Sequence, residues 1–245
     1  MMKFRYGIDR MTPGLALELC RGTLQGELTP AVIEKIRDNR NAVEDIVSGT
    51  ESVYGINTGF GPLCTTQISG DDTRKLQLNL LLSHAVGVGD YIPEEISRLM
   101  LILKVHSLAF GYSGISFHTI NRILWHIEQH ITPCVPSQGS VGASGDLAPL
   151  AHLFLPLIGY GQVRVKGKIA PAESALKGYN LNPLVLGPKE GLALINGTQF
   201  MAAHAVKFIE RFQNCLDHAE IIAAMNLEAM LGSVKTFDAA LHQLR

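Results

Sequence analysis

A string of small residues followed by an acid is the part of this sequence whose spacing most resembles a reactive site. Gly142, Ala143, Ser144, Gly145 and Asp146 place a hydroxyl between residues that have little or no side chain. A serine nucleophile elbow reads G-x-S-x-G, but aspartate stands here in place of the last glycine, and the chain lacks alternating strands and helices. A serine hydrolase is therefore disfavoured, and composition alone favours a flexible loop.

Two histidines have a spacing that could suit a metal ion. His126 and His130 are four residues apart in the segment H-I-E-Q-H, which is not the H-E-x-x-H order of zinc proteases. Catalytic zinc needs three protein ligands, and the sequence offers no third one nearby. We therefore expect these two residues to lie on an ordinary helix face, and we predict no metal site.

Helices are expected to position the reactive string. Thr29 and Pro30 fit an N-cap and a first helical residue, and Gly49 fits a helix end, so the apolar spacing between them predicts a helix over 30–48. The same reasoning predicts helices over 71–85, 94–109, 118–130 and 198–231. Asp146 can act as the N-cap of a short apolar helix that ends near Leu157.

Loops and one hairpin connect these helices. The segments 54–62 and 133–145 are rich in glycine, and the second is also rich in serine, so both are predicted to be loops. Residues 162–169 alternate with a period of two around Lys166 and Gly167, which predicts a small β-hairpin. It is the only convincing strand signal in the chain.

Composition excludes several classes of partner. The chain has 245 residues, of which 47% are hydrophobic and 18% charged, and this surplus of apolar residues suggests a helical oligomer. The formal charge is -1 with no run of like charges, so no nucleic acid or anionic membrane is expected as a partner. The most apolar stretch, 99–110, is interrupted by Lys104 and His106, which argues against a membrane span.

Cysteine usage and the N-terminus indicate a cytoplasmic protein. The four cysteines are scattered and form no C-x-x-C pair, which supports neither a zinc ribbon nor a disulfide scaffold. The first six residues lead into no apolar signal segment. We therefore expect reduced thiols and a cytoplasmic location.

The longer string 139–152, G-S-V-G-A-S-G-D-L-A-P-L-A-H, resembles the signature of the aromatic amino acid ammonia-lyases residue for residue. It is most similar to the histidine-specific members of that family. The segments 54–61, 77–89, 113–115 and 190–199 resemble further motifs of the family in the same order. The resemblance implies a mainly α fold, with an N-terminal domain over 1–195 and the start of a long central helical bundle over 196–245.

The family resemblance also implies a chemistry for the small-residue string. Ala143, Ser144 and Gly145 would condense into 4-methylidene-imidazol-5-one (MIO), an electrophile that requires no external cofactor. Glycine suits this reaction because its nitrogen must approach the Ala143 carbonyl closely. The implied activity is non-oxidative elimination of ammonia from L-histidine to give urocanate. Asp146 would assist the cyclisation.

Three further residues receive roles from the resemblance. Tyr54 would act as the base, which requires a phenol pKa below its usual value of about 10. Asn196 would lie near the MIO ring and the substrate, and His84 would recognise the substrate side chain. The simpler alternatives are a packing tyrosine, a helix-entry cap or chance glycosylation acceptor at Asn196, and a core histidine.

The family continues through a second helical half that carries further site residues, and this chain ends at Arg245 before them. We therefore expect the chain alone to be inactive, its MIO ring to be uncyclised, and the full-length protein to be a homotetramer that assembles each site from several subunits. Alternative functions are a tyrosine or phenylalanine ammonia-lyase, an aminomutase, or a noncatalytic helical assembly module.

Overall fold

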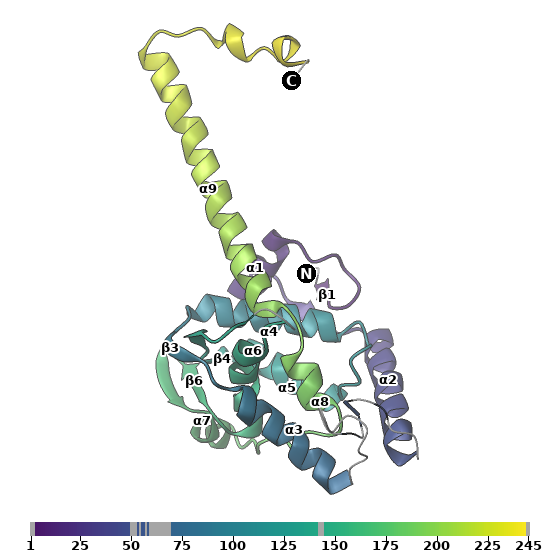
Figure 1. The fold of residues 1–245 in the computed structure, drawn as a ribbon. Helices are drawn as coiled ribbons and strands as arrows, with labels where there is room; N and C mark the ends of the chain where they lie inside the picture. Colours follow the sequence, from purple (N-terminus) through teal and green to yellow (C-terminus); the bar gives the residue numbers. More distant parts are fainter. Residues whose placement is uncertain are drawn as a thin grey trace.

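Helix α4 (Glu94–Leu108) runs through the centre of the molecule and is buried along most of its length. The computed structural model describes residues 3–49, 53, 55, 56, 58, 70–141 and 145–243, with the side chains of residues 70 and 71 left aside. Figure 1 shows α4 crossing the body of the molecule next to the place from which one long helix projects. Leu99, Met100, Ile102 and Val105 are completely buried on α4, so this helix forms the centre of the apolar core.

The other α-helices follow the expected mainly α pattern, and this fold class is confirmed. They are α1 (Pro13–Arg21), α2 (Pro30–Ser48), α3 (Gly70–His84), α5 (Phe117–Glu128), α6 (Leu147–Phe154), α7 (Ala172–Gly178), α8 (Glu190–Ile195) and α9 (Gln199–Ala229). The hydroxyl of Thr29 accepts a hydrogen bond from the Val32 amide, and Pro30 is the first helical residue. The capping signals therefore predicted the bounds of α2 correctly.

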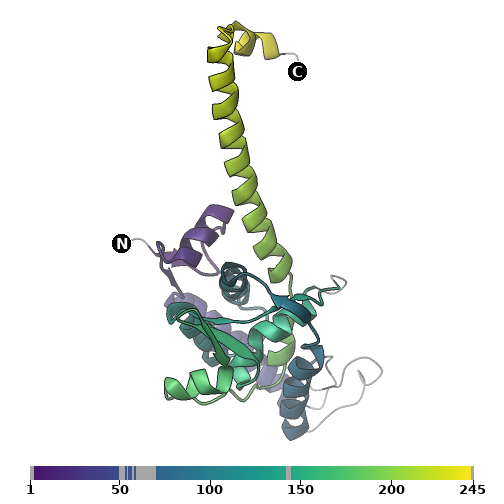
Figure 2. The ribbon, with the colours of Figure 1, turned by 90° about the vertical axis from the view of Figure 1, so that its left-hand side faces the viewer.

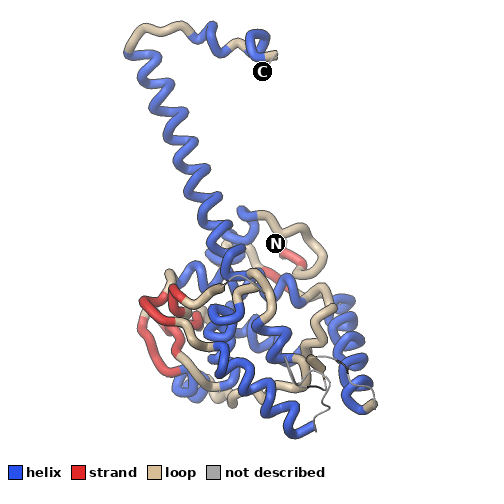
Figure 3. The backbone as a smooth tube through the Cα atoms, viewed as in Figure 1, coloured by secondary structure: helices blue, strands red, loops and turns tan. Residues whose placement is uncertain are grey.

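The predicted hairpin is confirmed and belongs to a larger sheet. Strand β6 (Gln162–Val165) pairs with β7 (Lys168–Pro171), and β4 (Ile131–Pro133) pairs antiparallel with the other edge of β6. Figure 3 shows this sheet on one side of the body. A separate pair joins β1 (Phe4–Arg5) to β2 (Gly26–Glu27) in parallel.

The segment 133–145, predicted to be a loop, contains a strand. Within it, β5 (Pro136–Gln138) pairs antiparallel with β3 (Val88–Tyr91), which follows α3. Both strands are too short to show an alternating pattern, and they are distant from each other in the sequence. No local sequence pattern therefore predicts their pairing.

The expected helix over 118–130 ends earlier than predicted. Helix α5 ends at Glu128, and His130 has a left-handed backbone with a φ of 53°. The chain turns there because Ile131 begins strand β4. His126 and His130 therefore do not share a helix face, which corrects the arrangement expected from their spacing.

Helix α9 has a packed base and a free outer part. Its first turns pack on α4 and α1, whereas residues 211–226 are all exposed (Figure 2). Charged side chains from three elements meet at its base, where Lys207 and Glu210 of α9 form ion pairs with Glu95 and Arg21. Beyond α9 the chain continues through short 3-10 turns at Val234–Phe237 and Ala239–His242.

No helix in the described part of the chain is both long enough and apolar enough to cross a membrane.

Candidate functional site

Gly145, Asp146 and Asn196 lie where the N-terminus of α6 meets the junction between α8 and α9. The amide of Asp146 donates a hydrogen bond to the carbonyl of Gly197 at 2.7 Å. This bond joins the reactive string directly to the segment that carries Asn196. Tyr54, Ala143 and Ser144 lie outside the described residues.

Asp146 has a different capping role from the one expected. It occupies the N-cap position of α6, but its side chain makes no capping hydrogen bond to that helix. Instead, Oδ2 accepts from the amide of Met201 in the first turn of α9 at 3.1 Å, and Oδ1 accepts from the hydroxyl of Ser140 at 3.1 Å. The side chain is completely buried. Asp146 therefore caps α9 across the site, since a carboxylate is favourable at any helix N-terminus that it can reach.

Gly145 is the one ring-forming residue that the structure describes. Its φ is +98°, in the region that favours glycine, and a Cβ atom there would collide with the Gly197 carbonyl oxygen. No other residue fits this position without displacing the α8–α9 junction. The close approach of two backbone segments explains the glycine at this position independently of any ring chemistry.

Asn196 ends α8 and does not cap α9, so the helix-entry alternative is wrong. Thr198 occupies the N-cap position of α9, whereas Asn196 is the C-cap of α8 and its amide donates to the Leu192 carbonyl. The residue is exposed. Its backbone carbonyl accepts a hydrogen bond from Nζ of Lys104 at 2.7 Å.

Lys104 interrupts the most apolar stretch of the sequence, and no site role is predicted for it from the sequence. In the structure it is 1% exposed, and burial lowers the pKa of its ammonium group to about 7. The available signal was a single lysine inside a helix that is otherwise apolar, because lysine is rarely fully buried without a specific partner. No sequence pattern indicates which atom that partner is.

His84 is the last residue of α3, which packs against both α6 and α8. The ring is half-buried, and Nδ1 donates to the Leu80 carbonyl at 2.8 Å. A neutral imidazole that donates through Nδ1 has an acceptor at Nε2. His84 can therefore accept a hydrogen bond from a donor on a ligand.

Two hydrogen bonds hold α3 in place beside the site. The amide of Gly87, just beyond α3, donates to Nε2 of His152 on α6 at 2.9 Å, and burial lowers the pKa of this histidine. Oε1 of Gln77 accepts from the amide of Gly191 on α8 at 2.9 Å. These bonds fix the helix of His84 relative to the helices that carry Asp146 and Asn196.

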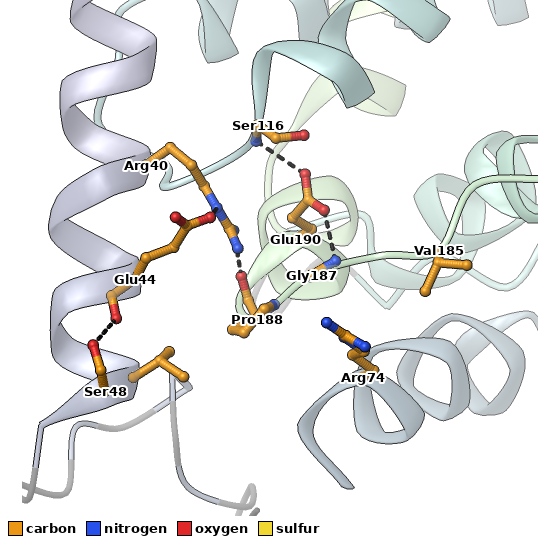
Figure 4. A pocket seen from close by; sticks show the side chains of 10 residues that line it. Arg40, Glu44, Ser48, Arg74, Ser116, Val185, Gly187, Pro188 and Glu190 are labelled. Carbon is orange, nitrogen blue, oxygen red and sulfur yellow. Dashed lines mark hydrogen bonds and ion pairs between the residues drawn. The ribbon is translucent and has the colours of Figure 1, made fainter. Parts of the chain in front are cut away.

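A cavity of about 670 Å³ lies between α2 and the segment that leads into α8 (Figure 4). Arg40 donates there to Glu44 and to the carbonyls of Gly114 and Pro188. Buried Glu190 accepts hydrogen bonds from Ser116, Thr119 and Gly187. These charged groups hold the start of α8 in place, and Gly145, Asp146, His84 and Asn196, the expected site residues that the structure describes, do not line the cavity.

Neither histidine of the 126–130 pair belongs to the site. His126 is buried and donates from Nδ1 to the Ile131 carbonyl at 3.0 Å, and burial lowers its pKa to about 4. Across the described residues, no three histidine, cysteine, aspartate or glutamate side chains are grouped so that they could hold a metal ion.

Comparison with known proteins identifies the family. A family model described as aromatic amino acid lyase matches residues 11–245. The chain belongs to the aromatic amino acid lyase family. A lyase of this family, histidine ammonia-lyase from Vibrio cholerae, is 44% identical to the chain over 228 residues, which are 93% of this chain and 45% of the relative.

Solved structures agree with this family assignment. The crystal structure of histidine ammonia-lyase from Trypanosoma cruzi matches the whole chain with a TM-score of 0.91 and 34% identity, and 48% of that protein is covered. Phenylalanine aminomutase from Pantoea agglomerans also gives a TM-score of 0.91, with 28% identity over the whole chain and 47% of that protein. The chain therefore spans less than half the length of these aromatic amino acid lyase relatives.

Proposed function

We propose that the full-length protein eliminates ammonia from L-histidine and releases urocanate. The observation that carries this proposal is the identity of 44% to a histidine ammonia-lyase over nearly the whole chain. An aminomutase whose structure matches with a TM-score of 0.91 is only 28% identical, so the shared fold does not account for the 44% identity to the histidine ammonia-lyase. Phenylalanine or tyrosine lyase and aminomutase activities are the alternatives within the family.

Ala143, Ser144 and Gly145 are the proposed source of an MIO group. The described flank of this string is compatible with that assignment, because Gly145 lacks a Cβ and its nitrogen can approach a neighbouring carbonyl as closely as ring closure needs. Asp146 is bound through both its amide and its carboxylate, which supplies a rigid support on one side. When formed, the group would supply an electrophile for the amine of the substrate.

The chain's other site residues would bind and orient the substrate. Tyr54 is the proposed base that removes the β-proton, and Asn196 is proposed to hydrogen-bond near the reacting amine. His84 is proposed to recognise the substrate's imidazole, whose N–H can donate to Nε2. Asp146 keeps the ring-forming string and the start of α9 together, which suits its proposed part in cyclisation.

We also propose that residues 1–195 form the MIO-bearing domain and that 196–245 begin a central helical bundle. Support comes from α9, whose outer part carries exposed apolar side chains that need cover in an aqueous protein, among them Phe212, Leu216, Ile221, Ile222 and Met225. A homotetramer would cover them. A cytoplasmic location without nucleic acid or membrane partners is consistent with the even charge balance.

The mass of the peptide that contains residues 143–145 tests the chemistry. In the full-length protein we expect this peptide to be lighter than its sequence by two water molecules, and we expect the full mass in a Ser144→Ala variant. An unmodified wild-type peptide together with an intact oligomer would instead support a noncatalytic assembly module.

A further inference from the structure

Lys104 is a charged side chain in the interior of the body that the proposed chemistry does not use. It lies on α4 and is flanked along the helix by Leu101, Ile102, Val105 and Leu108, which are all buried. Its ammonium group donates to the carbonyl oxygen of Asn196 at 2.7 Å. The hydrogen bond therefore links the central helix to the residue proposed to hydrogen-bond near the reacting amine.

Packing alone does not explain a lysine at this position. Burial lowers its pKa, and within the described part of the chain no carboxylate forms an ion pair with it. A buried charge without a counter-ion is costly, and an apolar side chain of similar volume would usually be tolerated as well or better. The cost requires a compensating role, and the Asn196 carbonyl is the group that Lys104 binds.

Two successive carbonyl groups are held at the α8–α9 junction. The carbonyl of Asn196 is bound by Lys104 of α4, and the carbonyl of Gly197 is bound by the amide of Asp146 beside α6. Gly197 itself has a φ of +152°, a backbone conformation that favours glycine. The Asn196 amide donates to the Leu192 carbonyl, so the peptide planes on both sides of the Asn196 Cα are held and the backbone that carries its side chain has little freedom to rotate.

We propose that Lys104 is a positioning residue for the lyase reaction. It holds the Asn196 carbonyl and thereby fixes the α8–α9 junction against the Gly145–Asp146 turn. The inference rests on the proposed function for its catalytic meaning, but the positioning itself is a property of this chain and can be measured without activity.

Amide hydrogen exchange on the 245-residue chain is the first test. Lys104→Met keeps the approximate length of the side chain and removes the donor, and Lys104→Arg retains a charged donor. We expect exchange in peptides covering 145–147 and 196–203 to be about tenfold or more faster in Lys104→Met, the effect of losing one charged hydrogen bond. Lys104→Arg should fall between Lys104→Met and the wild type.

Lys189→Met is the matched control. The ammonium of Lys189 also donates to a backbone carbonyl, that of Ser113 at 3.0 Å, and burial also lowers its pKa. It lies at the opposite end of α8 from Asn196. We expect this variant to leave exchange in 196–203 unchanged.

Steady-state kinetics on the full-length protein are the second test. We expect Lys104→Met to lower kcat with histidine by about tenfold or more and to change KM by less than about threefold, because the proposed effect is on geometry at the reacting atoms. The 143–145 peptide should still lose two water molecules. Wild-type protein without lyase activity would refute the proposed function, while the exchange result would still decide the role of Lys104.

Each of three results would overturn the inference. One is exchange in 196–203 that stays within about twofold of the wild type in Lys104→Met. The others are an equal increase across all peptides, including α5, and loss of the folded state, since either would mean that Lys104 only supports overall stability.

Discussion

Replacing Asp146 with alanine should destabilise the body of the protein by an amount that the structure allows us to estimate. The carboxylate is completely buried and accepts two hydrogen bonds, from the Met201 amide and the Ser140 hydroxyl, both at 3.1 Å. A hydrogen bond to a charged group contributes about 1.5–3 kcal/mol, and a buried donor left without a partner costs about 1–3 kcal/mol. The variant also removes the cost of burying a carboxylate, which offsets part of this loss. We expect a net loss of about 3 kcal/mol in the free energy of unfolding.

Urea unfolding followed by circular dichroism measures this loss. We expect a lower midpoint with an unchanged slope, because the surface exposed on unfolding stays the same. Asp146→Asn keeps one acceptor oxygen and should lose only about 1 kcal/mol. Asp238→Ala is the control, because Asp238 caps an exposed 3-10 turn by accepting from the Ala240 amide. This variant should change the free energy of unfolding by less than about 0.5 kcal/mol.

The two aspartate variants separate the possible explanations. If Asp146→Ala lost less than about 1 kcal/mol, the cap across the site would not stabilise the start of α9, and the reasoning would be wrong. If Asp146→Asn were as unstable as Asp146→Ala, the negative charge or the second acceptor oxygen would be responsible, since asparagine keeps only one neutral acceptor.

Three other predictions concern pH, packing and specificity. The pKa of His126 is about 4 in the folded chain and about 6.5 in the unfolded chain, so the unfolded chain binds more protons between these pH values. The contribution of His126 to the free energy of unfolding should therefore fall by about 3 kcal/mol as the pH drops from 7 to 4. Urea titrations of His126→Gln should lack this part of the pH dependence. A Cβ on Gly191 would lie 2.9 Å from the Gln77 carbonyl oxygen, so Gly191→Ala should cost about 1–3 kcal/mol in the same assay, whereas Gly14→Ala on α1 meets no neighbour and should be neutral or stabilising. In the full-length protein, His84→Phe should lower kcat/KM for histidine relative to phenylalanine by at least about tenfold, and an unchanged ratio would remove His84 from substrate recognition.

Local sequence signals predicted most of the helical fold. Thr29 with Pro30 marks the start of α2, and Gly49 marks its end, because capping depends only on nearby residues. The pairing of β3 with β5 could not be predicted in this way, since it joins residues about fifty positions apart through short segments without a pattern. His130 departs from the expected helix because a strand follows it directly.

The sequence predicts which residues belong to the candidate site, but not which contacts they make. The resemblance supplied the residue types, and the structure places Gly145, Asp146 and Asn196 at one junction. That Asp146 caps α9 rather than its own helix depends on how α6 meets α9, which no local rule describes. Lys104 acts through a backbone carbonyl 92 positions away, so its partner could be known only from the packed structure.

Urocanate formation by the full-length protein tests the central claim most directly. Histidine is incubated with the wild type and with Ser144→Ala, and urocanate is followed by its absorbance while ammonia is measured in parallel. We predict equal amounts of urocanate and ammonia from the wild type and a rate at least about a thousandfold lower for Ser144→Ala. A wild type that forms no urocanate, or that releases ammonia only from phenylalanine or tyrosine, would contradict the proposed function.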